Sequence, residues 1–379
     1  MKIDSKLNLI RKSNLVAIII FCYLFILTSC HNTKSDFQTV RKISSITPYQ
    51  DIRWKDLREI ESQLDSSMIK TLTYNKKTIW PNKYKSYANY LLSAGKNPGL
   101  EIRNLHKLGI TGKGVVVAII DQNICLDHPE YIGKIKEYHD VGCNLPSNSS
   151  SMHGPAVASL LVGDSIGTAP DASIYFVAAP SWTADAKYQA DALNWIIDKN
   201  STLPENQKIR AVSISAMPSG PGSPFTKNNS LWDSAYSKAI KTGLIVIDCT
   251  ENNGITSPCY YDIDKPDNIS KCLPGYPGIP YKANLTRICV PNSLRTVAEE
   301  YKLGEYSYTY WGRAGLSWAE PYLVGILALG WQLRPDISGQ EMIRLLHSTS
   351  YFDKNGTKII QPKVFVDSVK VYPMNKDKI

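Results

Sequence analysis

The residues best suited to covalent chemistry are a serine, a histidine and an aspartate that stand far apart in the chain. Ser317 stands two residues after Gly315 and precedes the apolar stretch 319–329, which predicts a buried helix. A helix N-terminus offers unpaired backbone N–H groups and a positive dipole end, and both favour negative charge on an attacked carbonyl oxygen. Because a serine hydroxyl is a weak nucleophile alone, Ser317 needs a base, and the base needs a group that orients it.

Two upstream segments offer these groups. Asp121 ends the run 115–121, whose continuous apolar and mostly β-branched residues predict a strand buried on both faces. Catalytic groups of open α/β sheets lie at such carboxyl ends. His153 begins the small-residue stretch 153–163, which is predicted to be a tightly packed helix. The pattern therefore predicts acyl transfer, with Ser317 as nucleophile, His153 as base and Asp121 as the orienting acid.

The three segments and their flanks resemble the subtilisin-like serine peptidases, the subtilases. Residues 121–124 with His128-Pro129 are similar to the family's Asp-Ser/Thr-Gly-Ile and His-Pro pattern, and residues 153–158 are similar to His-Gly-Thr-His-Val-Ala. Residues 315–321 are similar to Gly-Thr-Ser-x-Ala-x-Pro. The resemblance covers roughly residues 100 to 350 and implies a three-layer α/β fold with a mainly parallel central sheet flanked by helices. It also implies a serine endopeptidase that acts on peptides or proteins.

The resemblance assigns further roles. Residues 248–254 are similar to the family's Ala-Ala-Gly-Asn-x-Gly segment, which makes Asn252 the side-chain donor to the oxyanion, with Asn253 as the alternative if the register slips by one. Residues 212–216 match the substrate-lining strand, so the expected substrate-binding residues are Ser213, Ser215 and Ala216. An extended peptide would bind there by strand addition.

The chain also departs from the family pattern near the predicted site. Gln122-Asn123 stand where Ser or Thr and Gly are usual, Ala156 replaces a frequent second histidine, and Leu316 replaces a threonine. Trp318 and Glu320 add bulk and charge beside the nucleophile. No member of the triad is missing. Two functions therefore remain open, an active endopeptidase and a catalytically silent peptide-binding lipoprotein with a subtilase fold.

Residues 1–30 are predicted to be a lipoprotein signal peptide. Lys2, Lys6, Arg11 and Lys12 precede the apolar stretch 15–27, which is shorter than the ~20 residues that a spanning helix needs. The ending Leu27-Thr28-Ser29-Cys30 resembles a lipobox, so Cys30 is the expected lipidated residue of an exported protein anchored at the cell-envelope membrane. An ordinary signal peptide cut elsewhere is the alternative.

The remaining chain divides into three parts. Residues 31–100 form an N-terminal extension, either a retained tether or a propeptide-like segment, and residues 373–379 form a tail. Between them, residues 101–372 form the expected catalytic domain. Its predicted strands 174–179, 209–216 and 244–247 and helices 184–198 and 231–241 alternate as in a parallel sheet. An irregular insertion is expected at about 250–310, with only 287–290 predicted to be a strand.

The composition and the net charge limit the classes of partner that this protein is expected to bind. The 379 residues are 43% hydrophobic and carry a net charge of +9, but no aromatic and basic pattern indicates a nucleic-acid partner. The expected partners are a peptide or protein substrate and, through Cys30, a membrane. No required cofactor and no metal site is predicted, because no Cys-x-x-Cys pair or dense Asp/Asn loop is present. Structural calcium stays open. Cys259 and Cys272 are the first candidates for a disulfide.

Overall fold

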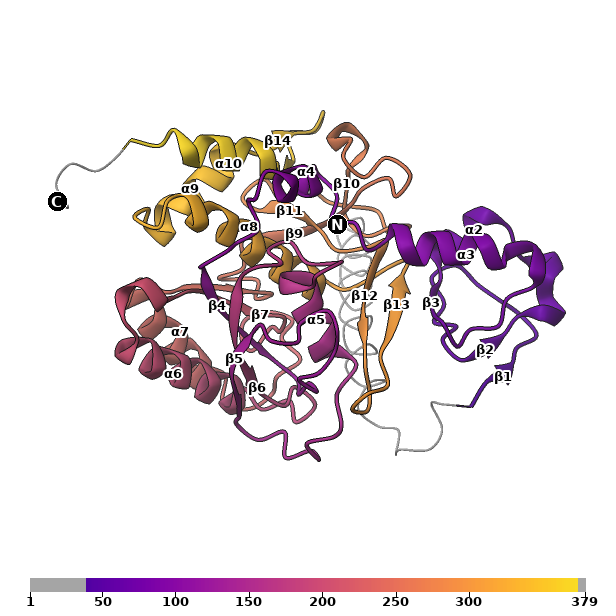
Figure 1. The fold of residues 1–379 in the computed structure, drawn as a ribbon, viewed down its shortest axis with the longest axis horizontal. Coiled ribbons are helices and arrows are strands. Elements are labelled where there is room, and N and C mark those ends of the chain that lie inside the picture. The colour runs from indigo at the N-terminus through magenta and orange to yellow at the C-terminus, as the bar shows by residue number, and fades with distance from the viewer. Residues whose placement is uncertain (1–38, 374–379) are drawn as a thin grey trace, which may run out of the picture.

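The computed structural model describes residues 39–373 (Figure 1). The predicted signal segment, Cys30 and residues 374–379 lie outside this range. The centre of the molecule is a five-stranded, wholly parallel sheet with the order β5-β6-β4-β7-β8. Its strands are β4 (Val116–Asp121), β5 (Ile135–Asp140), β6 (Ser173–Ala178), β7 (Ile209–Ile214) and β8 (Ile245–Asp248). All six residues of β4 are buried, as the apolar run predicts.

Helices cover both faces of this sheet. Val117 and Ile119 of β4 pack in one core with α5 (His153–Val162) and α8 (Ala319–Leu333). The alternate residues of the same strand pack in a second core with α6 (Lys187–Thr202) and α7 (Asn229–Lys241), which lie side by side in Figure 1. Successive side chains of a strand point to opposite faces, so one apolar run serves two cores. The predicted three-layer α/β fold is confirmed.

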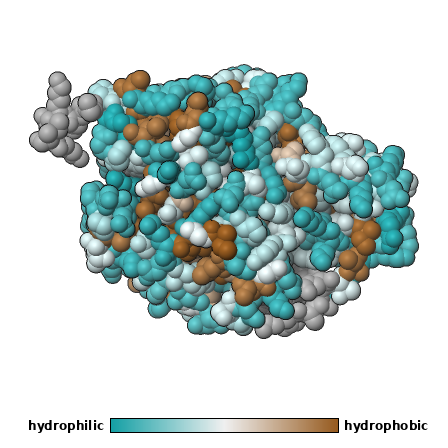
Figure 2. Space-filling model, viewed as in Figure 1, coloured by the Kyte–Doolittle hydropathy of each residue, from teal (hydrophilic) through white to brown (hydrophobic). Residues whose placement is uncertain are grey.

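The remaining helices surround these layers. Near the C-terminus, α9 (Gly339–Ser348) and α10 (Pro362–Lys370) pack together, and α10 contacts α8 and the short α4 (Ile102–Lys107). Within residues 39–373, no helix combines the length and the apolar character needed to cross a membrane. Figure 2 shows a largely hydrophilic surface on one face, interrupted by separate hydrophobic patches.

The segment 250–310, expected to be irregular apart from a strand at 287–290, contains that strand and four others, which belong to two sheets. One has the order β10-β9-β11-β15-β14, and the other has the order β12-β13-β3. Their bounds are β9 (Thr256–Tyr260), β10 (Leu273–Pro274), β11 (Ile288–Pro291), β12 (Arg295–Glu299), β13 (Ser307–Trp311), β14 (Tyr351–Phe352), β15 (Lys358–Ile359) and β3 (Thr73–Asn75). All five residues of β12 are buried although its sequence is Arg-Thr-Val-Ala-Glu. Polar residues buried on both faces give no apolar alternation, so the pattern did not reveal the strand.

Cys259 of β9 and Cys272 are both buried, with their sulfur atoms 3.4 Å apart. The structure therefore brings together the two predicted disulfide partners, but both are free thiols, as are the other four cysteines among the described residues.

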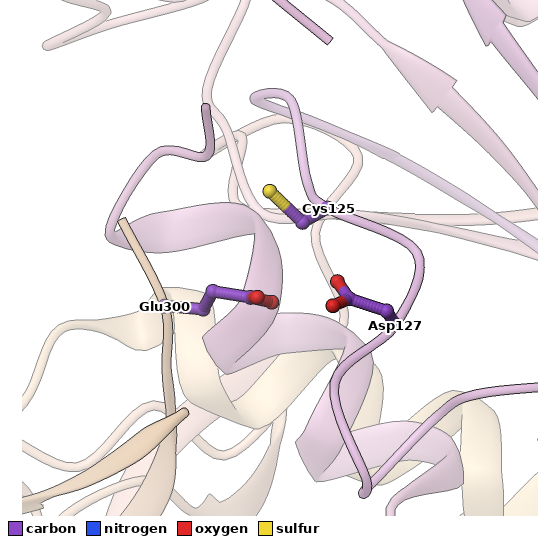
Figure 3. Close-up of side chains that lie close together, drawn as sticks. All are labelled: Cys125, Asp127 and Glu300. Carbon is purple, nitrogen blue, oxygen red and sulfur yellow. The ribbon is translucent and has the colours of Figure 1, made fainter. Parts of the chain in front are cut away.

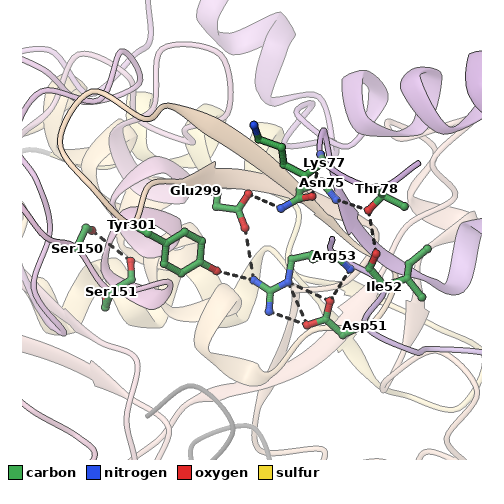
Figure 4. A network of polar contacts seen from close by, with 10 residues as sticks. All are labelled: Asp51, Ile52, Arg53, Asn75, Lys77, Thr78, Ser150, Ser151, Glu299 and Tyr301. Carbon is green, nitrogen blue, oxygen red and sulfur yellow. Dashed lines mark hydrogen bonds and ion pairs between the residues drawn. The ribbon is translucent and has the colours of Figure 1, made fainter. Parts of the chain in front are cut away.

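The N-terminal extension folds onto the α/β domain formed by the following residues. It contains β1 (Arg41–Lys42), β2 (Lys55–Asp56), a 3-10 turn at Arg58–Gln63, α2 (Ser66–Thr71) and α3 (Asn82–Ala94), and its β3 pairs with β13. Its apolar core includes Ile263 and Tyr310 from the α/β domain. Arg53 is nearly buried and contacts the Tyr301 hydroxyl at 2.9 Å and the Glu299 carboxylate at 3.5 Å (Figure 4). Strand pairing, an apolar core and a charged network thus join the two parts.

Candidate active site

Asp121 and His153 form a direct pair at the carboxyl end of β4. The Asp121 Oδ1 atom lies 2.7 Å from His153 Nδ1, and it also accepts the Gln122 N–H at 2.8 Å. The side chain of Asp121 is 4% exposed and that of His153 is 18% exposed. An ionised carboxylate only accepts hydrogen bonds, so the proton of this contact belongs on Nδ1 and Nε2 is left as the basic nitrogen. This is the orientation that a general base needs.

Gly154 explains how α5 comes so near the loop after Asp121. A Cβ atom on Gly154 would lie 2.4 Å from Cγ2 of Ile124 and 2.5 Å from the Gln122 carbonyl oxygen. The first turn of the helix is further fixed by the Ser151 hydroxyl, which accepts the Gly154 N–H at 2.9 Å. The His-Gly sequence therefore allows a close approach that a larger residue would prevent.

Ser317 lies in a 3-10 turn, Leu316–Trp318, that leads directly into α8. The Ser215 hydroxyl donates to the Ser317 carbonyl at 2.8 Å, and the Ser317 hydroxyl donates to the Ser215 carbonyl at 3.2 Å. Because Ser215 follows β7, these two bonds fix the serine turn to the same edge of the sheet that carries Asp121. Among the described residues, no hydrogen bond joins Ser317 to His153.

Trp318 links the serine turn to the histidine. Its ring meets the His153 ring edge to face at a centroid distance of 5.0 Å and meets Trp311 of β13 in the same way at 5.6 Å. Trp318 is 2% exposed. The imidazole is thus held between a carboxylate on one side and a buried indole on another. The large side chain of Trp318, which departs from the family pattern, thus supports His153 by packing against its ring from the protein interior.

One supporting residue was not found by sequence reasoning. Asn292 is fully buried, and its amide donates to the carbonyls of Ala314 at 2.8 Å and Gly315 at 3.2 Å. The next residue, Ser293, accepts the Ala314 N–H at 3.1 Å. These bonds fix the backbone that leads into the serine turn. The only available signal was an Asn-Ser pair after a predicted strand, which is indistinguishable from an ordinary turn.

Asn252 lies in the turn that follows β8. The ends of β7 and β8 are neighbours, since Ile214 pairs with Asp248 and the Cys249 N–H donates to the Ala216 carbonyl at 3.0 Å. Asn252 is exposed, and its amide nitrogen would lie 3.3 Å from a Cβ placed on Gly220. Its side chain makes no hydrogen bond within the described range. Asn252 therefore lies at the same edge of the sheet as Asp121, but among the described residues no hydrogen bond joins its amide to Ser317.

The predicted substrate strand needs a correction at Ser213. This residue is 1% exposed and lies inside the sheet, where it is paired with Ile119 on one side and Ile247 on the other. No free strand edge is therefore available at Ser213. Ser215 and Ala216, which follow β7, are half-buried. Of the three predicted substrate-binding residues, only Ser215 and Ala216 remain candidates.

Two carboxyl groups are buried beneath the site. Glu320 is fully buried, and its Oε1 accepts the Thr256 hydroxyl at 2.7 Å and the Cys249 thiol at 3.4 Å. Burial raises the pKa of Glu320 to about 8. Asp248 is 1% exposed, and burial raises its pKa to about 6. At neutral pH Glu320 is therefore mostly uncharged, so the charge expected beside Ser317 from the sequence is largely absent.

A separate group of side chains in the described range could hold a metal ion, namely Cys125, Asp127 and Glu300. It lies in the loop after Asp121 and at the end of β12, and the sequence analysis did not predict it.

Comparison with known proteins identifies a family that this chain resembles. Residues 112–285 match the family model described as Peptidase_S8, the subtilase family. Subtilisin-like protease 2 of Arthroderma otae is 27% identical over 184 residues, which are 48% of this chain and 41% of that protein. Subtilisin-like protease PopC of Myxococcus xanthus is 22% identical over 281 residues, which are 65% of this chain and 57% of that protein. The chain thus spans about two fifths of the length of the Arthroderma relative.

Two solved structures share the fold. Fervidolysin from Fervidobacterium pennivorans, described as a keratinolytic enzyme related to subtilisin, aligns with a TM-score of 0.54 and 15% identity over 73% of this chain and 46% of its own. The prenylagaramide maturation protease PagA aligns with a TM-score of 0.51 and 16% identity over 71% of this chain and 98% of its own. These likenesses establish a subtilisin-like fold, and the family match and the relatives support a subtilase.

Proposed function

We propose that this chain, with its subtilisin-like fold, is a serine endopeptidase that uses Ser317 as nucleophile, His153 as general base and Asp121 as the orienting acid. The observation that carries this proposal is the 2.7 Å contact between Asp121 and His153 at the edge of the sheet to which the Ser317 turn is fixed. The substrate would be a peptide or protein, as in the family that the sequence resembles.

The mechanism follows from these positions. The Ser317 hydroxyl turns from the Ser215 carbonyl toward His153 Nε2, gives up its proton and attacks the scissile carbonyl carbon. His153 then donates that proton to the leaving amine, while Asp121 stabilises the imidazolium. The Ser317 N–H and the Asn252 amide would donate to the oxyanion of the tetrahedral intermediate. Water enters next and repeats the two proton transfers to release the acid product.

Export and lipid anchoring at the cell envelope are part of the proposal. They rest on residues 1–30, where an apolar stretch ends in Leu27-Thr28-Ser29-Cys30. We further propose that residues 31–100 are retained as a tether rather than removed. The pairing of β3 with β13 supports retention, because removal would leave β13 as an open strand edge.

A catalytically silent peptide-binding protein is the second candidate. The observation that favours it is the Ser317 hydroxyl, which donates to Ser215 at 3.2 Å and makes no hydrogen bond to His153 in the described residues. Catalytic hydrogen bonds in substrate-free structures are often long or unformed, so the same geometry is also compatible with an active peptidase.

A fluorophosphonate probe separates the candidates. The purified full chain should be labelled at Ser317, as located by peptide mass spectrometry, and Ser317→Ala should not be labelled. His153→Ala should react far more slowly, because the hydroxyl then has no base. Ser201→Ala, which changes an exposed serine outside the site, is the matched control and should label normally. A folded wild-type chain that takes up no probe would favour the silent protein.

A further inference from the structure

Three potential metal ligands meet next to the predicted site. Cys125 and Asp127 lie in the loop after β4, and Glu300 follows β12 directly. Their sulfur and carboxylate oxygen atoms all lie within 4.8 Å of one another. Figure 3 shows the carboxylates of Asp127 and Glu300 facing each other, with Cys125 beside them. Cys125 is 1% exposed and Glu300 is fully buried.

The two carboxylates lack the partners that buried charges require. Glu300 Oε1 accepts the Gly304 N–H at 3.2 Å, whereas its buried Oε2 accepts no hydrogen bond. Asp127 Oδ2 accepts the Tyr306 hydroxyl at 2.7 Å, whereas its buried Oδ1 likewise accepts none. In residues 39–373, no lysine or arginine forms an ion pair with either group. Burial and the neighbouring Asp127 raise the pKa of Glu300 to about 7. Two carboxyl groups that face each other in this way either share a proton or hold a cation, and the thiol beside them adds a third metal ligand.

We propose that Cys125, Asp127 and Glu300 bind one divalent metal ion of the zinc class. Calcium and magnesium take shells made of oxygen alone, whereas zinc accepts a thiolate together with carboxylates. Tetrahedral zinc bonds place such donor atoms about 3.3 to 3.5 Å apart, so small side-chain rotations close the present cluster around the ion. Binding releases the thiol proton of Cys125, and any proton held by Glu300, to solvent, and water fills the fourth position.

The location indicates what the ion does. Cys125 stands four residues after Asp121 in the sequence, and Glu300 belongs to the turn that joins β12 to β13. An ion bound by both segments would fix the loop after Asp121 to the β12–β13 hairpin. Asp127 is only half-buried, which gives a metal ion in solution access to the cluster.

Cobalt titration tests the proposal directly. The full chain, carrying Ser317→Ala to prevent self-cleavage, is freed of metal with a chelator and titrated with Co²⁺. We expect one ion per chain, a thiolate-to-cobalt charge-transfer band, tetrahedral d–d bands, and displacement of cobalt by zinc. Cys125→Ala should abolish the charge-transfer band, and Glu300→Gln should weaken binding at least ~10-fold because one of three ligands is lost. Cys143→Ala, a change at another buried free thiol, should leave the spectrum intact.

A second measurement needs no ligand variant, so it remains informative if those variants fail to fold. X-ray absorption of the zinc-loaded Ser317→Ala chain should show one sulfur neighbour at about 2.3 Å and oxygen neighbours at about 2.0 Å. A shell without sulfur, weak non-stoichiometric cobalt uptake, or an unchanged spectrum in Cys125→Ala would each overturn the proposal. None of these readouts depends on peptidase activity, so the result is independent of the proposed function.

Discussion

The buried Glu320 gives a quantitative prediction about stability. It lies three residues after Ser317, within the first turn of α8, and burial raises its pKa from 4.5 to about 8. Thr256 and Cys249 both donate to Oε1, while Oε2 is buried without a hydrogen-bond partner. Glu320→Gln keeps a carbonyl oxygen for both donors and cannot ionise. The substitution therefore removes the titration with little change in packing.

The size of the effect follows from proton linkage. Between pH 4.5 and about 8, the folded chain keeps a proton that the unfolded chain has released, so wild-type stability falls as the pH rises. The slope is ~1.4 kcal/mol per pH unit, which over ~3.5 units gives an upper value of ~5 kcal/mol. Below pH 4.5 and above pH 8 the contribution of Glu320 is constant. Relative to wild type, Glu320→Gln should gain stability steadily across this window.

Urea unfolding at pH 5, 6, 7 and 8, with both proteins carrying Ser317→Ala, measures this difference. Glu205→Gln, which changes an exposed glutamate in a short 3-10 turn, is the control and should give a constant difference. If the free-energy difference between Glu320→Gln and wild type does not change with pH, or falls as the pH rises, Glu320 is ionised in the folded protein and the reasoning fails.

Three further predictions concern the site and the anchor. Asn252→Ala should lower kcat ~100-fold with little change in KM, which is the scale known for an oxyanion-hole donor in subtilisin, and Asn253→Ala should be near wild type. The reverse result would show that the register is displaced by one residue. Gly154→Ala should lose about 1–3 kcal/mol in urea unfolding, because the new methyl group would lie 2.4 Å from Ile124. Cys30→Ala should take up no radioactive fatty acid and leave the membrane fraction, and unchanged partition would contradict lipidation.

The central sheet could be predicted because its signal is local. β4 is a continuous apolar run that serves two cores, so its type and its end at Asp121 follow from six neighbouring residues. The β12-β13-β3 sheet could not be predicted in this way. β13 pairs with β3, more than two hundred residues away, and β12 buries Arg295 and Glu299. Pairing over such a distance is decided by tertiary packing and not by local pattern.

The candidate site, like the fold, could be predicted only where the signal is local in the sequence. The order Asp121, His153 and Ser317, with Gly154 and Gly315 close to the last two, predicts three side chains at one edge of the sheet. The sequence could not show that Glu320 is buried, so a residue that looked like a charge beside the nucleophile is mostly neutral. The metal-ligand cluster was missed for a related reason, since Glu300 is far in sequence from Cys125 and Asp127.

A continuous series of ring contacts connects the N-terminal extension to the histidine. The Arg53 guanidinium lies 5.1 Å from the centroid of the Trp311 ring, Trp311 meets Trp318 edge to face, and Trp318 meets His153 in the same way. Arg53 belongs to the extension and Trp311 to β13, the strand with which β3 pairs. Loss of the extension would remove the cation over Trp311 and uncover the strand that carries it. The Trp318 indole, which supports His153, would then pack against an altered Trp311. This is a physical reason for the proposed peptidase to keep its extension.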